Sequence, residues 1–62
     1  MALPEDLPFK VVRDIGGQDE ILARSASLII ARGAYGAAVG MYPRELIELR
    51  NGALVVQNSR EP

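Results

Sequence analysis

The stretch Ile47-Glu-Leu-Arg-Asn-Gly-Ala-Leu-Val-Val56 decides the fold of this chain of 62 residues. Asn51-Gly52 stands between two apolar runs, and this pair readily adopts the two positive φ angles of a type I′ turn. The stretch therefore predicts a β-hairpin in which Arg50 pairs with Ala53 and Leu49 with Leu54. Side chains alternate along a strand, so one face carries Ile47, Leu49, Leu54 and Val56, and the other carries Glu48, Arg50, Val55 and Gln57.

A second interpretation of the same region is a helix over residues 43–50. Pro43 suits the first turn of a helix, and Asn51-Gly52 suits a helix C-cap. We prefer the hairpin, and the helix remains the alternative.

Another hairpin is predicted nearer the start of the chain. Residues 9–14 and 20–24 form two short runs suited to strands, and Gly16-Gly17 lies between them. A two-residue turn sets Asp14 opposite Asp19, which is unfavourable, and a longer loop through Asp19 would relieve this contact. The register therefore stays open. The two-residue turn gives the further pairs Arg13 with Glu20, Val12 with Ile21, and Val11 with Leu22.

A helix of about four turns is predicted between the hairpins. Ser25 or Ser27 can cap its start, and Pro43 disfavours the helical conformation in the residue before it, so the helix ends near Tyr42. Spacing the residues at 100° places them on three arcs. The first arc holds Leu28, Ala31, Tyr35, Ala38, Val39 and Tyr42, with Ile30, Ala34 and Met41 beside it, and the third holds Ile29, Gly33, Gly36, Ala37 and Gly40.

This helix is apolar on every side, because Arg32 is its only charged residue. A helix that covers a sheet normally shows a polar face to water. We call the third arc, Ile29, Gly33, Gly36, Ala37 and Gly40, the glycine stripe, and we predict it as a contact surface for a second copy or another protein. Two alternatives stay open. The stripe could face the chain's own sheet while Tyr35 and Tyr42 turn to water, or the helix could be frayed or kinked.

These elements together predict an α+β fold of the type ββαββ. A four-stranded, mainly antiparallel sheet carries the helix on one face, and the strand order stays open. Adjacent apolar residues such as Val11 and Val12 point to opposite faces, so one helix cannot cover all of the apolar side chains of the sheet. We predict a single domain over residues 9–58, a mobile arm at residues 1–8 and a disordered tail at residues 59–62.

The size of the chain favours self-association. A domain of this length buries only roughly 60% of the surface that its unfolded chain exposes. Small domains gain further stability from disulfides, metals or oligomerisation, and the sequence contains no cysteine and no histidine. We therefore predict a homodimer.

Charge and hydropathy argue against several other classes of protein. Seven basic and eight acidic residues give a net charge of −1, the basic residues are dispersed along the chain without forming a stripe, and there are only three aromatic residues. Nucleic acid is therefore not expected as a partner. Residues 25–42 include Arg32 and fall short of the ~20 apolar residues of a membrane helix. The first eight residues carry acids where a signal peptide has bases, so we expect a cytoplasmic protein.

Catalytic or metal-binding residues are not evident. Without histidine or cysteine, a catalytic site would depend on carboxylates, lysine, serine or tyrosine. Asp14, Asp19 and Glu20 flank a turn but lack the ligand spacing of an EF-hand. Glu45 and Glu48 would point to opposite faces of a strand, which does not suit an acid and base pair. We predict no enzyme activity and no cofactor.

The strand and turn motifs Phe9-Lys-Val-Val-Arg13, Glu20-Ile-Leu-Ala-Arg24 and Ile47-Glu-Leu-Arg-Asn-Gly-Ala53 together resemble those of a group of short, uncharacterised bacterial proteins. The group shares a hairpin, helix, hairpin layout. The resemblance implies a compact α+β fold with no assigned activity. The helices of that group usually carry more charge than this one.

The sequence therefore favours a small noncatalytic protein-interaction module, most simply a homodimer. Its contact surface would be the glycine stripe or a sheet edge. The alternative is a small dimeric regulator associated with nucleic acid.

Overall fold

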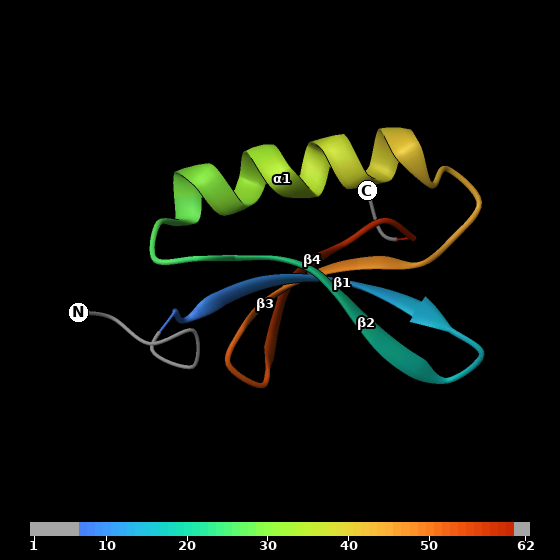
Figure 1. Cartoon of the computed structure of the whole chain (residues 1–62), viewed down its shortest axis with the longest axis horizontal. Coiled ribbons are helices and arrows are strands. Elements are labelled where there is room, and N and C mark those ends of the chain that lie inside the picture. The colour runs from blue at the N-terminus through green and yellow to red at the C-terminus, as the bar shows by residue number, and fades with distance from the viewer. Residues whose placement is uncertain (1–6, 61–62) are drawn as a thin grey trace.

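The structure, a computed structural model, describes residues 7–60. The element order is β1 (Phe9–Ile15), β2 (Gln18–Ser25), α1 (Leu28–Met41), β3 (Ile47–Asn51) and β4 (Leu54–Asn58). All neighbouring strands are antiparallel, in the order β2-β1-β3-β4. The helix lies along one face of the twisted sheet (Figure 1), which confirms the ββαββ fold. The helical interpretation of residues 43–50 is wrong, because residues 47–51 form β3.

The ends of the domain are tied to the second hairpin. Of the predicted arm and tail, residues 1–6 and 61–62 lie outside the described residues. The carbonyl oxygen of Pro8 accepts a hydrogen bond from the N–H of Gly52 at 3.0 Å. Ser59 donates its N–H to the carbonyl of Ile47 at 2.9 Å, and its Oγ accepts from the N–H of Ile47 at 3.0 Å.

The first hairpin has the two-residue turn at Gly16-Gly17. Both glycines have positive φ angles, 58° and 89°, as a type I′ turn requires. Asp14 does face Asp19, and an Oδ1 of Asp14 accepts from the N–H of Gly17 at 3.1 Å. The other predicted pairs agree with the structure except one. A β-bulge shifts the register, so Val11 pairs with Ala23 and not with Leu22.

The bulge in β2 has a packing reason. A bulge sets two residues of one strand against one residue of its partner. Leu22 and Ala23 consequently both pack against the core on the helix side, which strict alternation along the strand would not allow.

The second hairpin turns one residue later than predicted. Its two loop residues are Gly52 and Ala53, so Asn51 pairs with Leu54 and Arg50 with Val55. Gly52 has a φ of 61°, whereas Ala53 is not among the residues with positive φ, and this combination matches a type II′ turn. The predicted pairs of Arg50 with Ala53 and of Leu49 with Leu54 are therefore wrong.

A second β-bulge interrupts this hairpin. Leu49 pairs with Gln57, two residues beyond the partner of Arg50, so Val56 is the extra residue of β4. The helix packs on β1, β2 and β3, and β4 is the outer strand. Leu54 and Val56 are consequently 66% and 39% exposed.

The helix has the predicted limits. Ser27 is the N-cap, and its Oγ accepts from the N–H of Ile30 at 3.4 Å. Tyr42 is the C-cap, and its N–H donates to the carbonyl of Ala38 at 2.8 Å. Between these caps the helix runs through 14 residues without a break.

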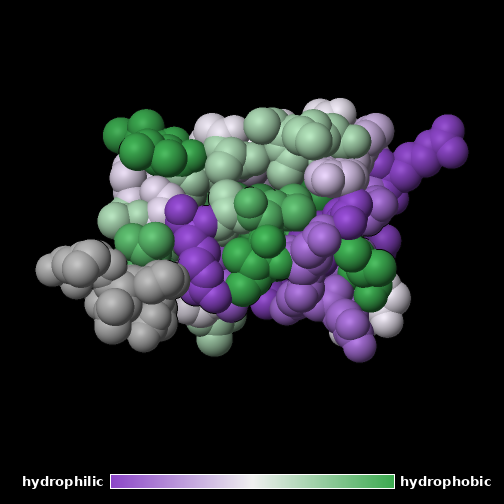
Figure 2. Space-filling view, in the orientation of Figure 1, coloured by the Kyte–Doolittle hydropathy of each residue, from purple (hydrophilic) through white to green (hydrophobic). Residues whose placement is uncertain are grey.

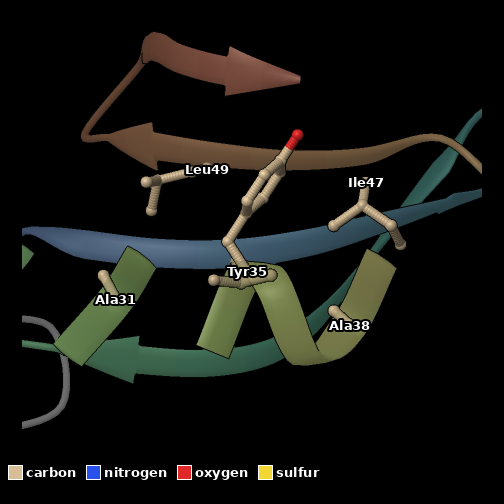
Figure 3. Close-up of a cluster of buried hydrophobic side chains, with 6 residues drawn as sticks. Ala31, Tyr35, Ala38, Ile47 and Leu49 are labelled. Carbon is tan, nitrogen blue, oxygen red and sulfur yellow. The ribbon is translucent and has the colours of Figure 1, made fainter. Parts of the chain in front are cut away.

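One hydrophobic core lies between the helix and the sheet. The ring of Tyr35 reaches from α1 toward β3 and lies between Leu49 and Ile47, with Ala31 and Ala38 on either side (Figure 3). Burial raises the pKa of the Tyr35 hydroxyl, because the charged form is poorly solvated there. The buried members of the core are Val11, Ala31, Tyr35, Ala38, Ile47 and Leu49.

Candidate interaction surfaces

The glycine stripe faces away from the sheet. Ile29 is 83% exposed, and Gly33, Gly36, Ala37 and Gly40 are exposed as well. A Cβ atom built on any of the three glycines would meet nothing within 4 Å. The interpretation in which the stripe packs on the chain's own sheet is therefore wrong, and Tyr35, which that interpretation turned to water, is buried.

Two larger apolar side chains extend this surface. Ile30 and Met41, which the sequence placed beside the first arc, are 67% and 70% exposed. Figure 2 shows a strongly hydrophobic group over the start of α1 and weakly hydrophobic residues along the rest of its outer side. We call Ile29, Ile30, Gly33, Gly36, Ala37, Gly40 and Met41 the outer helix surface. It extends for about 18 Å along the helix at 1.5 Å per residue.

Arg13 fixes the end of the helix on the sheet. It contacts Glu20 of β2 at 2.6 Å, and its Nε lies 3.5 Å from a carboxylate oxygen of Glu45 in the loop after α1. Its guanidinium also lies 4.2 Å from the centre of the Tyr42 ring. A cation over an aromatic ring adds to the attraction of the two carboxylates. These contacts tie the C-cap of α1 and the loop after it to β1 and β2.

The opposite face of the sheet carries no helix within residues 7–60. We call it the open sheet face. Arg50 points to it, because the neighbouring Leu49 is fully buried on the helix side. The guanidinium of Arg50 contacts Asp19 of β2 at 2.6 Å and also binds Glu48. The hydrogen bonds that the guanidinium donates to these two carboxylates, to Asp19 first and then to Glu48, raise the pKa of Arg50.

The ion pair between Arg50 and Asp19 crosses β1, which lies between their two strands. Beneath it, Val12 is only 1% exposed although it points away from the helix. Its cross-strand neighbours are Ile21 and Glu48. Arg50 lies opposite Lys10 and Asp19 lies opposite Asp14, so the ion pair spans the position of Val12. We infer that the apolar part of the Arg50 side chain helps these neighbours to shield Val12 from water.

Three basic residues form a row across the open sheet face. Lys10 of β1 pairs directly with Arg24 of β2 on one side and with Arg50 of β3 on the other. The prediction that the basic residues form no stripe is wrong for these three. Among residues 7–60, Arg50 has acidic partners, whereas no ion pair is formed by Lys10 or Arg24. We call Arg24, Lys10 and Arg50 the basic row.

The acidic residues considered as metal ligands or catalytic groups are separated by the fold. Asp14 and Asp19 lie on the open sheet face, whereas Glu20 lies on the helix side with Arg13. Glu45 and Glu48 bind different arginines on opposite faces of the sheet. No cluster of three or more possible metal ligands occurs in the described part of the chain.

Comparisons of the chain with protein-family models, curated proteins and solved structures found no match. No helix within residues 7–60 has the length and hydropathy needed to cross a membrane.

Proposed function

We propose that the chain is a noncatalytic protein-interaction module that forms a symmetric homodimer through its outer helix surface. The supporting observation is the exposure of Ile29, Ile30 and Met41, at 83%, 67% and 70%, around three glycines. Apolar side chains gathered on one surface gain free energy when a partner removes them from water. Single exposed apolar residues are common in proteins, but a whole helix face is not.

The distribution of large and small residues supports an antiparallel helix pair. Ile29 and Ile30 lie in the first turn of α1, whereas Gly36 and Gly40 lie toward its other end. In a two-fold symmetric pair each patch meets the same surface of the partner. An antiparallel arrangement sets the isoleucines of one copy against the glycines of the other. The glycines also allow the two helix axes to approach to the short end of the usual 8–10 Å range.

Sedimentation equilibrium of the intact chain tests the dimer. We expect a concentration-dependent mass that approaches twice the monomer mass of 6.7 kDa. Gly36→Leu should convert the protein to a monomer, because the added leucine side chain would hold the partner helix away. The fold should persist in this variant, since a Cβ at Gly36 has no neighbour within 4 Å.

Ala26→Leu is the matched control, because it adds the same side chain at an exposed position before the helix. This variant should stay dimeric. A monomeric mass for the unaltered chain at high concentration would refute the dimer. Dimerisation of Gly36→Leu with unchanged affinity would exclude the outer helix surface as the contact.

A further inference from the structure

The basic row is a costly arrangement for an isolated sheet. Like charges directly opposite each other on neighbouring strands are destabilising, and Lys10 lies between Arg24 and Arg50. Arg50 reaches Asp19 and Glu48 instead. Lys10 and Arg24 therefore remain the members of the row that an external anion can neutralise.

The described acids of the chain are already engaged elsewhere. Asp19 and Glu48 bind Arg50, and Glu20 and Glu45 lie against Arg13. The carboxylate of Asp14 accepts from the backbone N–H of Gly17. Within residues 7–60, none of these acids forms an ion pair with Lys10 or Arg24, so carboxylates from a partner can bind these two residues.

Apolar side chains accompany the basic row. Val55 of β4 pairs with Arg50 and continues the row, and Ile21 of β2 lies beside the buried Val12. Ile21 and Val55 are 44% and 42% exposed. The open sheet face thus offers positive charge at Lys10 and Arg24 together with aliphatic surface.

The spacing of the row matches a helix. Neighbouring strands lie about 4.8 Å apart, so Arg24, Lys10, Arg50 and Val55 repeat at about that interval across the four strands. Residues three or four apart on a helix lie about 5–6 Å from one another. Carboxylates at positions i and i+4 can therefore face Arg24 and Lys10, and an apolar residue about two turns further along can cover Val55.

The aromatic residues favour a protein partner over single-stranded nucleic acid. Sheets that bind single strands stack the bases on aromatic side chains. Phe9, Tyr35 and Tyr42, which are all the aromatic residues of the chain, belong to or pack against the core on the helix side.

We propose that the open sheet face binds an acidic amphipathic helix of a partner protein, with its carboxylates on Lys10 and Arg24 and its apolar side chains on Ile21 and Val55. This surface lies opposite the outer helix surface. The inference is therefore independent of the homodimer, and one chain can use both surfaces.

Fluorescence anisotropy with a synthetic probe tests this proposal on the full chain. The probe is a labelled, alanine-based peptide of about 15 residues, long enough to form a helix. It carries glutamates at positions i and i+4 and leucines about two turns further along. We expect saturable binding that weakens as salt is added, because salt screens the ion pairs. A peptide with glutamines in place of the glutamates should bind at least about tenfold more weakly.

Variants of the protein locate the site. Lys10→Glu combined with Arg24→Glu should weaken binding of the probe at least about tenfold, by repelling its carboxylates. Arg44→Glu combined with Arg60→Glu is the matched control, because both residues are exposed and lie outside the strands that carry the basic row, and the affinity should change less than about twofold. Ile21→Ser combined with Val55→Ser should weaken binding about fivefold through lost apolar contact. Circular dichroism should show the same folded spectrum for each variant.

Three results would overturn the proposal. The first is absence of saturable binding. The second is equal loss of binding in the control variant. The third is tighter binding of an oligothymidylate than of the peptide, which would assign the basic row to nucleic acid.

Discussion

The guanidinium of Arg50 on β3 meets the carboxylate of Asp19 on β2 at 2.6 Å, across the strand β1 that separates them. The contact joins two strands that are not neighbours in the sheet. It also lies over Val12, which has no helix above it. Arg50 therefore helps to cover the open sheet face, as α1 covers the other face.

We expect Arg50→Ala to lower the free energy of unfolding by about 1–2 kcal/mol. The variant uncovers Val12 and leaves Glu48, whose side chain is 18% exposed, without its cation. Urea denaturation followed by circular dichroism measures the change. Arg24→Ala is the matched control from the same row, and it should leave the stability unchanged or slightly higher because Arg24 forms no ion pair within the described residues. Equal losses in the two variants would contradict this role of Arg50.

Lys10→Glu should stabilise the domain. The substitution replaces two like-charge cross-strand pairs by two opposite-charge pairs, with Arg24 and Arg50, and we expect a gain of about 0.5–1 kcal/mol. Lys10→Gln should give a smaller gain, since it only removes the repulsion. Thermal melting at low salt measures both variants. A decrease in stability would show that the repulsion between these bases is already relieved.

Gly36→Ala and Gly52→Ala should change the stability in opposite directions. Alanine is favoured over glycine in a helix by about 1 kcal/mol, and the Cβ at Gly36 has open space. Gly52 has a φ of 61° in the second hairpin, where alanine costs about 1–2 kcal/mol. Urea denaturation at a concentration where the chain is monomeric compares the two. Stabilisation by Gly52→Ala would contradict the turn geometry.

The domain should lose stability at alkaline pH because of the buried Tyr35. Burial raises the pKa of Tyr35 above its ordinary value of 10.0 in the folded state. The stability that the buried, protonated Tyr35 contributes is complete below pH 10.0, the pKa of an ordinary tyrosine. This contribution is lost as the pH rises through the folded pKa, because the unfolded chain releases the proton first. Tyr35→Phe should therefore make the stability less dependent on alkaline pH.

Urea midpoints measured from neutral pH to about pH 11 test this dependence. Tyr42→Phe is the matched control, because it removes the other tyrosine and retains Tyr35. The control should lose stability with pH as the unaltered chain does. A Tyr35→Phe variant with the same pH profile as the unaltered chain would show that Tyr35 is not responsible.

The helix is the element that the sequence described best. Its caps at Ser27 and Tyr42 follow from Pro43 and from local sequence, and its buried side follows from the spacing of the first arc. The direction of the glycine stripe was not decided by that spacing, because every side of the helix is apolar. The sheet decides it, since Tyr35 fills the space between Ile47 and Leu49 and the small residues would leave that space empty.

The strand registers were predicted less well than the strands themselves. Asn51-Gly52 favours a turn with both residues at its centre, but in the structure the two central residues of the turn are Gly52 and Ala53. The two bulges, at Leu22 and Val56, adjust which side chains face the core. Such adjustments depend on packing between elements and have no local signature in the sequence.

The basic row was missed because its members come from three separate segments. Lys10 and Arg24 meet in the first hairpin, but Arg50 joins them only through the pairing of β1 with β3. That pairing depends on the strand order, which local patterns leave open. Had β1 been placed beside β3, the alternation of side chains along the strands would have indicated the row.

The position of β1 between β2 and β3 also has a consequence for folding. Phe9 pairs with Asn51, so the central ladder closes a loop that contains the whole of β2 and α1. Contacts between such distant parts of a chain slow folding. During synthesis, β1 can pair with β2 soon after both have left the ribosome, but its other edge stays open until α1 and β3 have emerged as well. The native sheet is therefore completed only after the second hairpin has left the ribosome.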